Sequence, residues 1–541
     1  MTRVRNAALA IVPAAFLAVF FLYPVATLIG RGLFGAGPGS DLGRLGDVLT
    51  GGRFLKIIWF TLWQAVASTA LTVAVAAPLT WAVANRQFPG RRLVRVLVTV
   101  PFVLPTVVVG GAWIALADRL GLADGTIRIR HTVWAILLAH AFFNVAVIVR
   151  SVGGYWSRLD RRPEEAARTL GARPRQVFVE VTLPRLRAAL LSAVSIVFLF
   201  SFTSFAIILL LGGPRRSTIE TEIFRWAVTR TDIATAAALS VVQMVAVAAL
   251  VLLNTRLQGR AARQRLIGDR ALPIQSRRDR IVVGAALAGS GLFLGTPLVL
   301  LLERSLTTGD GTWTLENYRG LAERVRLLPI SGTDALVNSL SFAVAAAGIA
   351  LIIGGLASLA IVHGGRFTSR LLDLGMLLPI GTSAVTLGFG VLISLDRGVL
   401  DLRGSWWIVP LTQSLIAIPF VVRSVVPVLR SIDPRMREAA ATLGATPGAV
   451  RREIDLRIGA RALATGVGFA FAISLGEFGA TSFVGRRSDL LTVPLAIERL
   501  LGTPGQLLRG QAMALSVVLM IVTAIVVLIG DRLHPDGGGV L

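Results

Sequence analysis

The chain contains no cysteine among its 541 residues. This absence excludes a disulfide framework, a thiolate nucleophile and a metal site built on cysteine ligands. Lysine is nearly absent as well, because Lys56 is the single lysine. A P-loop needs a lysine after its glycine-rich segment to reach the nucleotide phosphates, and Lys56 lies in GGRFLKII, which has no such motif. Any ATP that drives this protein must therefore be hydrolysed by another chain.

Charged residues are scarce for a protein of this length. They make up 16% of the chain against 54% hydrophobic residues, and the mean hydropathy is +0.73. This composition is too apolar for an ordinary soluble protein. The net charge of +25 is also found in nucleic-acid-binding proteins, but here the arginines lie in short loops between apolar runs, as in the cytoplasmic loops of membrane proteins. We predict a membrane protein that binds no nucleic acid.

Apolar runs of about 20 residues are long enough to cross a bilayer. They predict an all-α, multi-pass membrane protein with about 12 transmembrane helices. The arginine-dense loops are expected on the cytoplasmic side, together with both termini. The predicted spans lie near 7–30, 57–84, 94–117, 132–150, 188–211, 233–254, 281–302, 337–362, 371–395, 406–430, 461–484 and 511–530.

The predicted helices fall into two copies of a six-helix unit. Pro24 matches Pro297 and Arg31 matches Arg304 in one common register. An even number of spans in each copy gives both copies the same orientation, so the repeats are parallel. We predict a first repeat over 1–254, a basic cytoplasmic linker over 255–280 and a second repeat over 281–541.

A polar segment is also repeated in the same register. Residues 164–184 read EEAARTLGARPRQVFVEVTLP, and residues 437–457 read REAAATLGATPGAVRREIDLR. Asp160 and Asp433 are placed to cap a short helix, and Gly171 and Gly444 are placed to end it. Prolines at 174 and 447 start a second short helix. Each copy is thus a helix, a glycine turn and a helix in a cytoplasmic loop, over 158–187 and 431–461. Two such elements suit a two-fold symmetric partner.

These segments resemble the cytoplasmic loop of the binding-protein-dependent permeases of ABC importers. The matching residues are Glu165, Ala166, Ala167 and Gly171 in the first copy and Glu438, Ala439, Ala440 and Gly444 in the second. The second copy departs from the family pattern at Arg457, where the first has Pro184. The stretches LLAHAFFN and FAISLGEFGATSFVG are similar to thiamine permeases, and the latter also to molybdate and sulfate permeases.

The resemblance implies the type I ABC importer permease fold, with both halves fused on one chain, in the bacterial cytoplasmic (inner) membrane. It also implies that these residues dock on two ATP-binding cassette subunits, and that an extracytoplasmic binding protein delivers the substrate. No cofactor is expected in this chain, because ATP and magnesium would bind to the partner subunit. Surrounding lipid is a further partner. The resemblance gives thiamine (or its phosphates) as the first substrate and ferric iron as the second.

Polar residues inside the predicted spans are candidates for the translocation path, because such groups are costly in a membrane. Glu477 either lines the path or forms hydrogen bonds within a broken helix. Ser474 and Ser201 occupy matching positions in the two repeats, and Asn144 shares a helix face with His140. No third metal ligand accompanies His140, so no metal site is predicted.

A second function remains open from the residues alone. An ion-gradient-driven secondary transporter of the 6+6 helix type has the same duplication, so counting helices does not separate the two classes. A membrane scaffold or a lipid-modifying enzyme has little support, because the sequence has no catalytic triad or paired-carboxylate site. The two repeated cytoplasmic elements favour the ABC permease, which is a transport subunit and not an enzyme.

Overall fold

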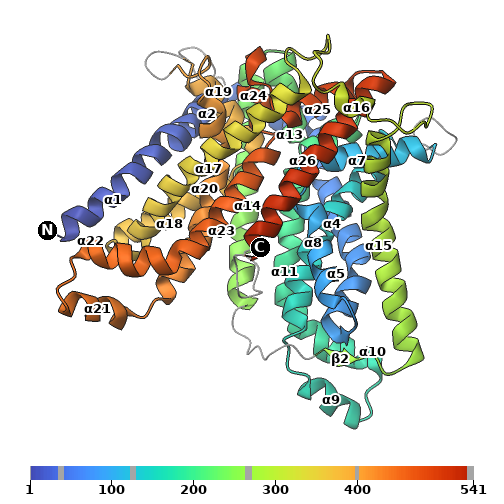
Figure 1. The fold of residues 1–541 in the computed structure, drawn as a ribbon, viewed down its shortest axis with the longest axis vertical. Helices are drawn as coiled ribbons and strands as arrows, with labels where there is room; N and C mark the ends of the chain where they lie inside the picture. The colour runs from blue at the N-terminus through green and yellow to red at the C-terminus, as the bar shows by residue number, and fades with distance from the viewer. Residues whose placement is uncertain are drawn as a thin grey trace. The chain divides into compact units, whose positions relative to one another are not determined.

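The computed structural model describes residues 2–34, 42–121, 130–261, 271–396, 401–485 and 487–532. The protein is almost entirely helical, which confirms the all-α prediction (Figure 1). The elements through the first repeat and the linker are α1 Thr2–Leu17, η1 Ala18–Leu22, α2 Tyr23–Phe34, α3 Leu42–Thr50, α4 Gly52–Asn85, β1 Arg86–Gln87, α5 Arg91–Leu97, α6 Val100–Val103, α7 Thr106–Arg119, α8 Val133–Trp156, α9 Arg162–Thr169, α10 Pro174–Gln176, η2 Val177–Thr182, α11 Leu183–Phe202, α12 Ala206–Leu211, α13 Ile219–Phe224, η3 Arg225–Thr229, α14 Ile233–Ala261 and β2 Leu272–Pro273.

The elements of the second repeat follow a similar order. They are α15 Arg277–Ser305, α16 Glu316–Arg319, α17 Gly332–His363, α18 Arg366–Leu377, η4 Leu378–Gly381, α19 Ala384–Ser394, α20 Ile408–Ser431, α21 Pro434–Thr442, α22 Pro447–Val450, η6 Arg451–Leu456, α23 Arg457–Gly476, α24 Thr481–Val484, η7 Ser488–Leu490, α25 Val493–Gly502 and α26 Gln506–Arg532. The predicted linker, 255–280, includes residues 262–270, which lie outside the described residues. The repeat boundaries stay a prediction.

Ten helices in the described ranges are long and apolar enough to cross a membrane. The segments 91–103 and 106–119 form an eleventh span if they are counted as one, but they meet at 98°. The predicted span 371–395 is divided between α18 and α19, with the turn η4 between them. The predicted spans 188–211 and 461–484 also break near their ends, after α11 and after α23, so four of the twelve predicted spans are not continuous helices.

Proline accounts for the interruptions within the predicted spans 94–117 and 371–395. Leu104 has an extended backbone before Pro105, as the residue that precedes a proline prefers. In the second repeat Pro379 lies in the first positions of η4. Because proline has no N–H to donate and clashes with the preceding turn, a helix ends or bends there unless its neighbours compensate.

The chain folds as two compact units, each containing the core of one repeat and the first helix of the other. The first unit comprises 1–51, 222–244 and 305–540, and the second comprises 52–221 and 245–304. The helices of the two sequence repeats are therefore exchanged in space. Helix α14 contributes residues to both units.

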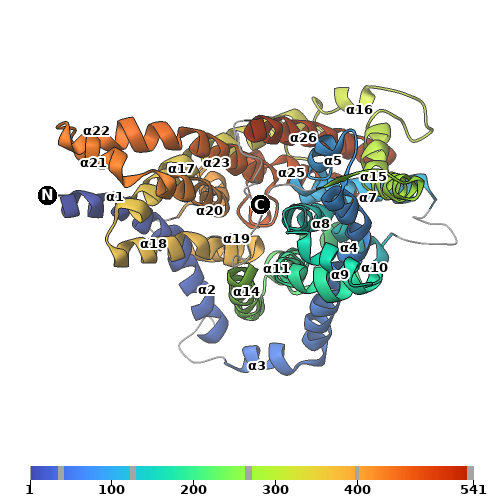
Figure 2. The ribbon, with the colours of Figure 1, turned by 90° about the horizontal axis from the view of Figure 1, so that it is seen from below.

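In the first unit, α1 packs along α17 and also contacts α18 (Figures 1 and 2). Leu17 and Phe21 are buried in the same apolar cluster as Ala350 and Ile353. Helix α2 packs on α19, where Gly390 lies against the backbone of Pro24. The first helix of the chain thus completes the core of the second repeat.

In the second unit, α15 occupies the corresponding place. Phe293 of α15 lies 6.1 Å from the ring of Trp113 and 6.4 Å from that of Phe142. At the end of the helix Glu303 pairs with Arg119 at 3.2 Å. The first helix of the second repeat therefore completes the core of the first.

The long helices α4 and α17 each accept an equivalent buried hydrogen bond within their own unit. The hydroxyl of Thr61 on α4 accepts the free backbone N–H of Ile219, at the start of α13, at 3.1 Å. The hydroxyl of Ser339 on α17 accepts that of Val493, at the start of α25, at 2.8 Å. An N–H at the start of a helix has no partner within the helix, so each hydroxyl satisfies a buried donor and fixes the helix that it caps.

Candidate functional site

The first repeated polar segment forms a helix, a glycine turn and a second helix, as predicted. Asp160 accepts the backbone N–H of Arg162 at the start of α9. The chain then reverses at Gly171, whose φ is +85°, and restarts at Pro174. The N–H of Ala172 bonds to the carbonyl of Ala167 at 3.0 Å, which is the closing bond of a glycine-terminated helix. In Figure 1 α9 lies beyond the end of α11.

The second polar segment has the same geometry. Asp433 accepts the N–H of Arg435 at 2.9 Å, and Gly444 has a φ of +83°. The N–H of Ala445 bonds to the carbonyl of Ala440 at 3.0 Å. Arg457 stands where the first copy has Pro184, yet the chain leaves both segments through a π turn into a long helix. The departure at Arg457 therefore does not change the exit. We call these segments, 158–187 and 431–461, the first and second docking elements.

Two glycines leave an open space on the outer side of the docking elements. A side chain at Gly171 or at Gly444 would meet nothing within 4 Å in this chain. The left-handed backbone explains why glycine is needed for the turn. Of the neighbouring motif residues, Glu165, Ala166, Glu438 and Ala439 are exposed, and Ala167 and Ala440 are half-buried. Packing within the chain therefore does not explain why the exposed Ala166 and Ala439 are small.

Each docking element presents one leucine that is almost fully exposed. Leu170 is 88% exposed and Leu443 is 89% exposed, and the two occupy the same position in the repeat. A leucine exposed so fully stabilises nothing in the chain itself. Repeated at symmetric positions, it is typical of an anchor for a partner surface.

Polar contacts attach the first docking element to the helices behind it. The hydroxyl of Thr182 donates to Glu164 at 2.7 Å, and Arg161 donates to the side chain of Asn85, the last residue of α4, at 3.1 Å. Arg185 donates to the carbonyl of Asp160 at 2.6 Å. Partial burial lowers the pKa of the Arg161 guanidinium, and the nearby Glu164 carboxylate counteracts part of that shift. The element is thus held to α4 and α11 rather than hanging free.

Glu477 follows the last residue of α23, and its carboxylate is occupied within its own turn. One oxygen accepts the N–H of Ala480 at 2.6 Å, and the other accepts the N–H of Thr481 at 2.8 Å and also its hydroxyl. The side chain is buried, with 7% exposure of the residue. These bonds satisfy the free donors at the start of α24. They account for a buried acid at this position, whereas its role in a path stays a prediction.

Asn144 and Ser201 lie at one polar seam inside the second unit, between α4, α8 and α11. Gln64 donates to the carbonyl of Ser201 at 2.9 Å, and Asn144 donates to that of His140 at 3.0 Å. The hydroxyl of Ser68 lies 2.9 Å from the Nδ1 of His140. All five residues are at most 1% exposed. The structure therefore connects two of the predicted path residues through side chains that the sequence analysis did not single out.

Several acceptors and donors in this seam have no protein partner among the described residues. They are Gln64 Oε1, His140 Nε2, Asn144 Oδ1 and Ser201 Oγ. Buried polar atoms are nearly always paired with protein or water, so the seam has capacity for water or for a polar guest. Gln64 could have been found from the sequence, since a glutamine in an apolar span is unusual. The second repeat has Gln413 and Ala417 where the first has His140 and Asn144.

Ser474 lies in the first unit, on α23, and is 1% exposed. Its hydroxyl has no partner among the described residues. Clusters of histidine and acidic residues able to hold a metal ion are also absent from the ranges that the structure covers. Asn144 and Ser201 thus belong to the second unit, and Ser474 and Glu477 belong to the first.

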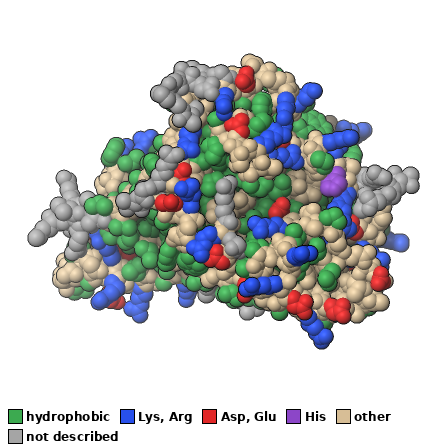
Figure 3. All heavy atoms as spheres, turned by 90° about the horizontal axis from the view of Figure 1, so that it is seen from above, with side chains coloured by type: hydrophobic (Ala, Val, Ile, Leu, Met, Phe, Trp, Pro, Cys, Tyr) green, Lys and Arg blue, Asp and Glu red, His purple; other side chains and the backbone are tan. Residues whose placement is uncertain are grey.

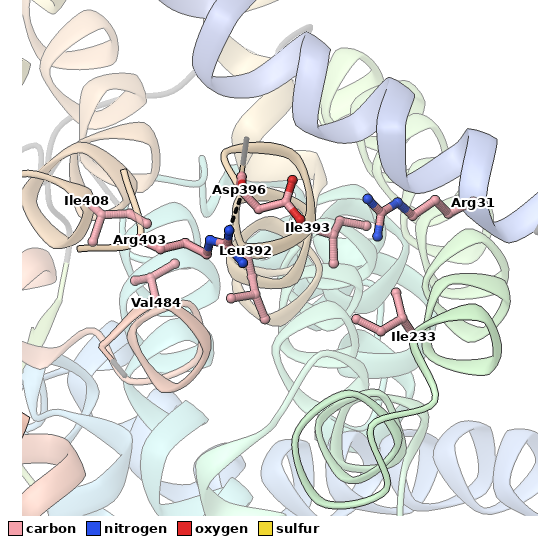
Figure 4. A pocket seen from close by; sticks show the side chains of 8 residues that line it. All are labelled: Arg31, Ile233, Leu392, Ile393, Asp396, Arg403, Ile408 and Val484. Atoms are coloured by element: carbon pink, nitrogen blue, oxygen red, sulfur yellow. Dashed lines mark hydrogen bonds between the residues drawn. The ribbon is translucent and has the colours of Figure 1, made fainter. Parts of the chain in front are cut away.

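A cavity of about 130 Å³ opens in the first unit at the end of α20 that lies away from the second docking element (Figure 4). Arg31 and Arg403 approach Asp396 from opposite sides in this view, and Arg403 donates to the carbonyl of Asp396. The other lining residues are Ile233, Leu392, Ile393, Ile408 and Val484. Basic and acidic side chains are interspersed over this end of the helices (Figure 3).

The sequence matches one protein family twice. Residues 74–265 and 350–536 each match the binding-protein-dependent transport system inner membrane component. The two matches contain the two docking elements and most of the membrane-spanning helices.

Individual proteins are similar over most of the chain. The thiamine transport system permease protein ThiP of Salmonella typhimurium is 28% identical over 465 residues, which cover 83% of each chain. The protein of the same name from Brucella abortus is 28% identical over 540 residues, covering 96% of this chain and 94% of the relative. The sulfate transport system permease protein CysT of Salmonella typhimurium is 32% identical over 172 residues, covering 31% of this chain and 62% of the relative.

Proposed function

Because the chain belongs to the family of binding-protein-dependent transport system inner membrane components, we propose that it receives substrate from an extracytoplasmic binding protein and passes it to the cytoplasm while two partner subunits hydrolyse ATP. The chain is an integral inner-membrane protein and a transport subunit. It is an ABC importer permease of the ThiP type. We further propose that both termini and both docking elements lie in the cytoplasm.

The observation that carries this proposal is the pair of docking elements. They have the same turn geometry, and each presents a leucine that is almost fully exposed, Leu170 in one and Leu443 in the other. A partner assembled from two equal subunits would offer one pocket to each leucine. The exposed motif residues Glu165, Ala166, Glu438 and Ala439 would border these contacts. Gly171 and Gly444 would let the partner approach the backbone closely.

The ATPase activity is assigned to a separate chain. This chain has no Walker A lysine, since Lys56 stands outside any glycine-rich phosphate loop. ATP and magnesium would therefore bind to the partner subunits, and closure of those subunits would move the docking elements. The bonds from Arg161 to Asn85 and from Arg185 to Asp160 give that movement a path into α4 and α11.

Thiamine is the proposed substrate, and ferric iron is the second choice. The relatives that cover most of this chain are named thiamine transport system permeases, which supports thiamine at modest identity. Asn144 and Ser201, in the polar seam, and Ser474 and Glu477, in the second repeat, are the proposed path residues. Neutral hydrogen-bonding groups such as those of the seam suit an organic substrate better than a bare metal ion.

The test is uptake of labelled thiamine by cells that lack this chain, compared with the same cells after the chain is restored. We expect a loss of uptake that the intact chain rescues, and uptake that stops when ATP is depleted while the ion gradient is maintained. Ferric-iron uptake is measured in parallel. Normal thiamine uptake with impaired iron uptake would mean that ferric iron, and not thiamine, is the substrate. Uptake that persists without ATP would indicate a secondary transporter.

A further inference from the structure

The first docking element is attached to α4 at a point where two arginines lie near each other. Asn85, the last residue of α4, accepts from the guanidinium of Arg161 through its side-chain oxygen at 3.1 Å and through its carbonyl at 3.4 Å. Arg86 is the next residue in the chain. Burial lowers the pKa of Arg161, the Glu164 carboxylate counteracts part of the shift, and the positive charge of Arg86 adds to it. Like charges at this distance repel each other.

An acid at the start of α15 neutralises Arg86. The Nη2 of Arg86 lies 3.0 Å from Oδ1 of Asp279, and the two side chains are only 18% and 26% exposed. A pair that is mostly buried is screened by salt less than one on the surface. Within the described ranges no second acid lies at ion-pair distance from Arg86. Asp279 therefore compensates the charge that would otherwise act on Arg161.

The backbone around Asp279 is fixed against α4 and the turn that follows it. The strand β2 pairs in parallel with β1, with Leu272 opposite Arg86. Ile274 packs on the apolar cluster between α4 and α15. The hydroxyl of Ser276 accepts the N–H of Asp279 at 3.0 Å and caps α15. These contacts hold the carboxylate beside Arg86.

Neither member of this ion pair has a charged counterpart in the other repeat. Counting from the equivalent hydroxyls of α4 and α17, Gly364 stands where the first repeat has Arg86. In the register of the first helices, Asn6 stands where α15 has Asp279. The cation and the acid that neutralises it are thus present together at one docking element, and the sequence lacks both at the other.

The second docking element is attached through residues of its own repeat. Asp455, on η6, is 0% exposed and pairs with Arg437 of α21 at 2.8 Å. The Nε2 of His363, at the end of α17, lies 3.0 Å from the other carboxylate oxygen. Arg437 also donates to the carbonyl of Leu429 at 2.9 Å. A change at the start of α15 should therefore leave this attachment unaltered.

We propose that Asp279 is a positioning residue for coupling, which neutralises Arg86 and thereby lets Arg161 bind to the end of α4. This inference rests on the proposed function, since it concerns how closure of the partner subunits reaches α4. Asp279 acts through the two arginines, and it comes from the helix that begins the second repeat. Loss of its charge alone loosens the first docking element, whereas removal of both charges of the ion pair leaves that element in place.

The mobility of the docking elements tests this role directly. The chain has no cysteine, so single spin labels can be placed on Thr169→Cys in α9 and on Thr442→Cys in α21 of the full chain in lipid nanodiscs. Both positions are exposed. We expect Asp279→Asn to make the label at 169 more mobile and to leave the label at 442 unchanged.

A second variant distinguishes charge compensation from a general loss of structure. Arg86→Gln alone should not make the label at 169 more mobile, because it removes the repulsion on Arg161. Added to Asp279→Asn, it should restore the wild-type mobility. Failure of this double variant to restore it, or an equal response of the label at 442, would overturn the proposal.

Transport provides a further measurement, in proteoliposomes that contain the complex with its co-purified ATPase subunits and binding protein. We expect Asp279→Asn to lower the labelled thiamine imported per ATP by about fivefold, the effect of weakening one charge-assisted hydrogen bond. The double variant with Arg86→Gln should regain the wild-type ratio. Asp401→Asn is the matched control, since it removes the ion pair with Arg403 at 3.3 Å, between α19 and α20, and should keep the wild-type ratio.

The failure of this inference and the failure of the proposed function give different results. A wild-type complex that imports with ATP, with Asp279→Asn like the wild type in both assays, would refute the role of Asp279 and leave the proposed function intact. A wild-type complex without ATP-dependent uptake would refute the proposed function itself. If Asp279→Asn does not fold, the double variant with Arg86→Gln still decides, because it should fold with the label at 169 as immobile as in the wild type. A mobile label there would contradict the proposal.

Discussion

The exposed leucines of the docking elements give the sharpest test of the ATPase interface. Leu170 and Leu443 are 88% and 89% exposed, so shortening either to alanine should change the free energy of unfolding of the isolated permease by no more than about 0.5 kcal/mol. If a partner buries each leucine, the same change should remove about 2 kcal/mol from binding. That loss corresponds to roughly 30-fold weaker affinity for each site.

The assay is binding of purified permease variants to the co-purified ATP-binding subunit, with thermal unfolding measured on the same samples. Because the two leucines belong to separate elements, their effects should add, and the double variant should bind roughly a thousandfold more weakly. Trp313→Ala provides the control, since Trp313 is 73% exposed but lies between α15 and α16, outside both docking elements. It should leave the affinity unchanged.

Unchanged affinity in the double leucine variant would refute the assignment of these segments as docking elements. A loss of affinity with an equal loss in thermal stability would mean that the leucines support the fold instead. Only a loss of affinity at constant stability agrees with the structure.

Three further predictions concern the fold and its response to acid. Glu477→Gln should lower the free energy of unfolding by about 1–3 kcal/mol, because an amide presents one acceptor oxygen where the carboxylate uses both. Thermal melts in detergent measure this loss. If thiamine uptake falls by more than the amount of folded protein, Glu477 also has a role in the path. Gly388→Ala should destabilise by about 1–3 kcal/mol, because the added carbon would lie 2.5 Å from the backbone of the 477–481 turn, whereas Gly348→Ala meets nothing within 4 Å and should not destabilise. Burial raises the pKa of Asp232, but hydrogen bonds from Thr235 and the charge of Arg44 outweigh it, so the pKa is lowered in the folded state. The stability that Asp232 supplies is therefore present at neutral pH and lost as the pH falls through this lowered value, and Asp232→Asn should remove that part of the acid dependence of unfolding.

In the polar seam, residue types alone predict some of the residues but not their contacts. Asn144 and Ser201 could be selected from the sequence because polar groups in apolar spans are costly. Gln64, which donates to Ser201, and Ser68, which contacts His140, lie on another helix, 137 and 72 positions away in the chain. Which of these helices pack together depends on the fit of whole helix faces, which no local pattern records.

The contacts of Glu477 could not be predicted from the residue type either, although its partners are only a few residues away in the chain. The sequence left two interpretations open, a group on the path and an acid bonded within a broken helix. The bonds to Ala480 and Thr481 depend on the backbone turning after α23, so that two N–H groups face the carboxylate. The turn, and not the residue type, decides where the oxygens point.

The sequence by itself determined the membrane class, the duplication and the helix–turn–helix shape of the two docking elements, because hydrophobic run length, capping aspartates and turn glycines act within a few residues of chain. The glycine turns at 171 and 444 formed where the sequence placed them. Only the tertiary structure decided that each compact unit takes its first helix from the other repeat. It also brought His363 to Asp455. These pairings join segments far apart in the chain, where packing and charge select among many arrangements that the same local signals allow.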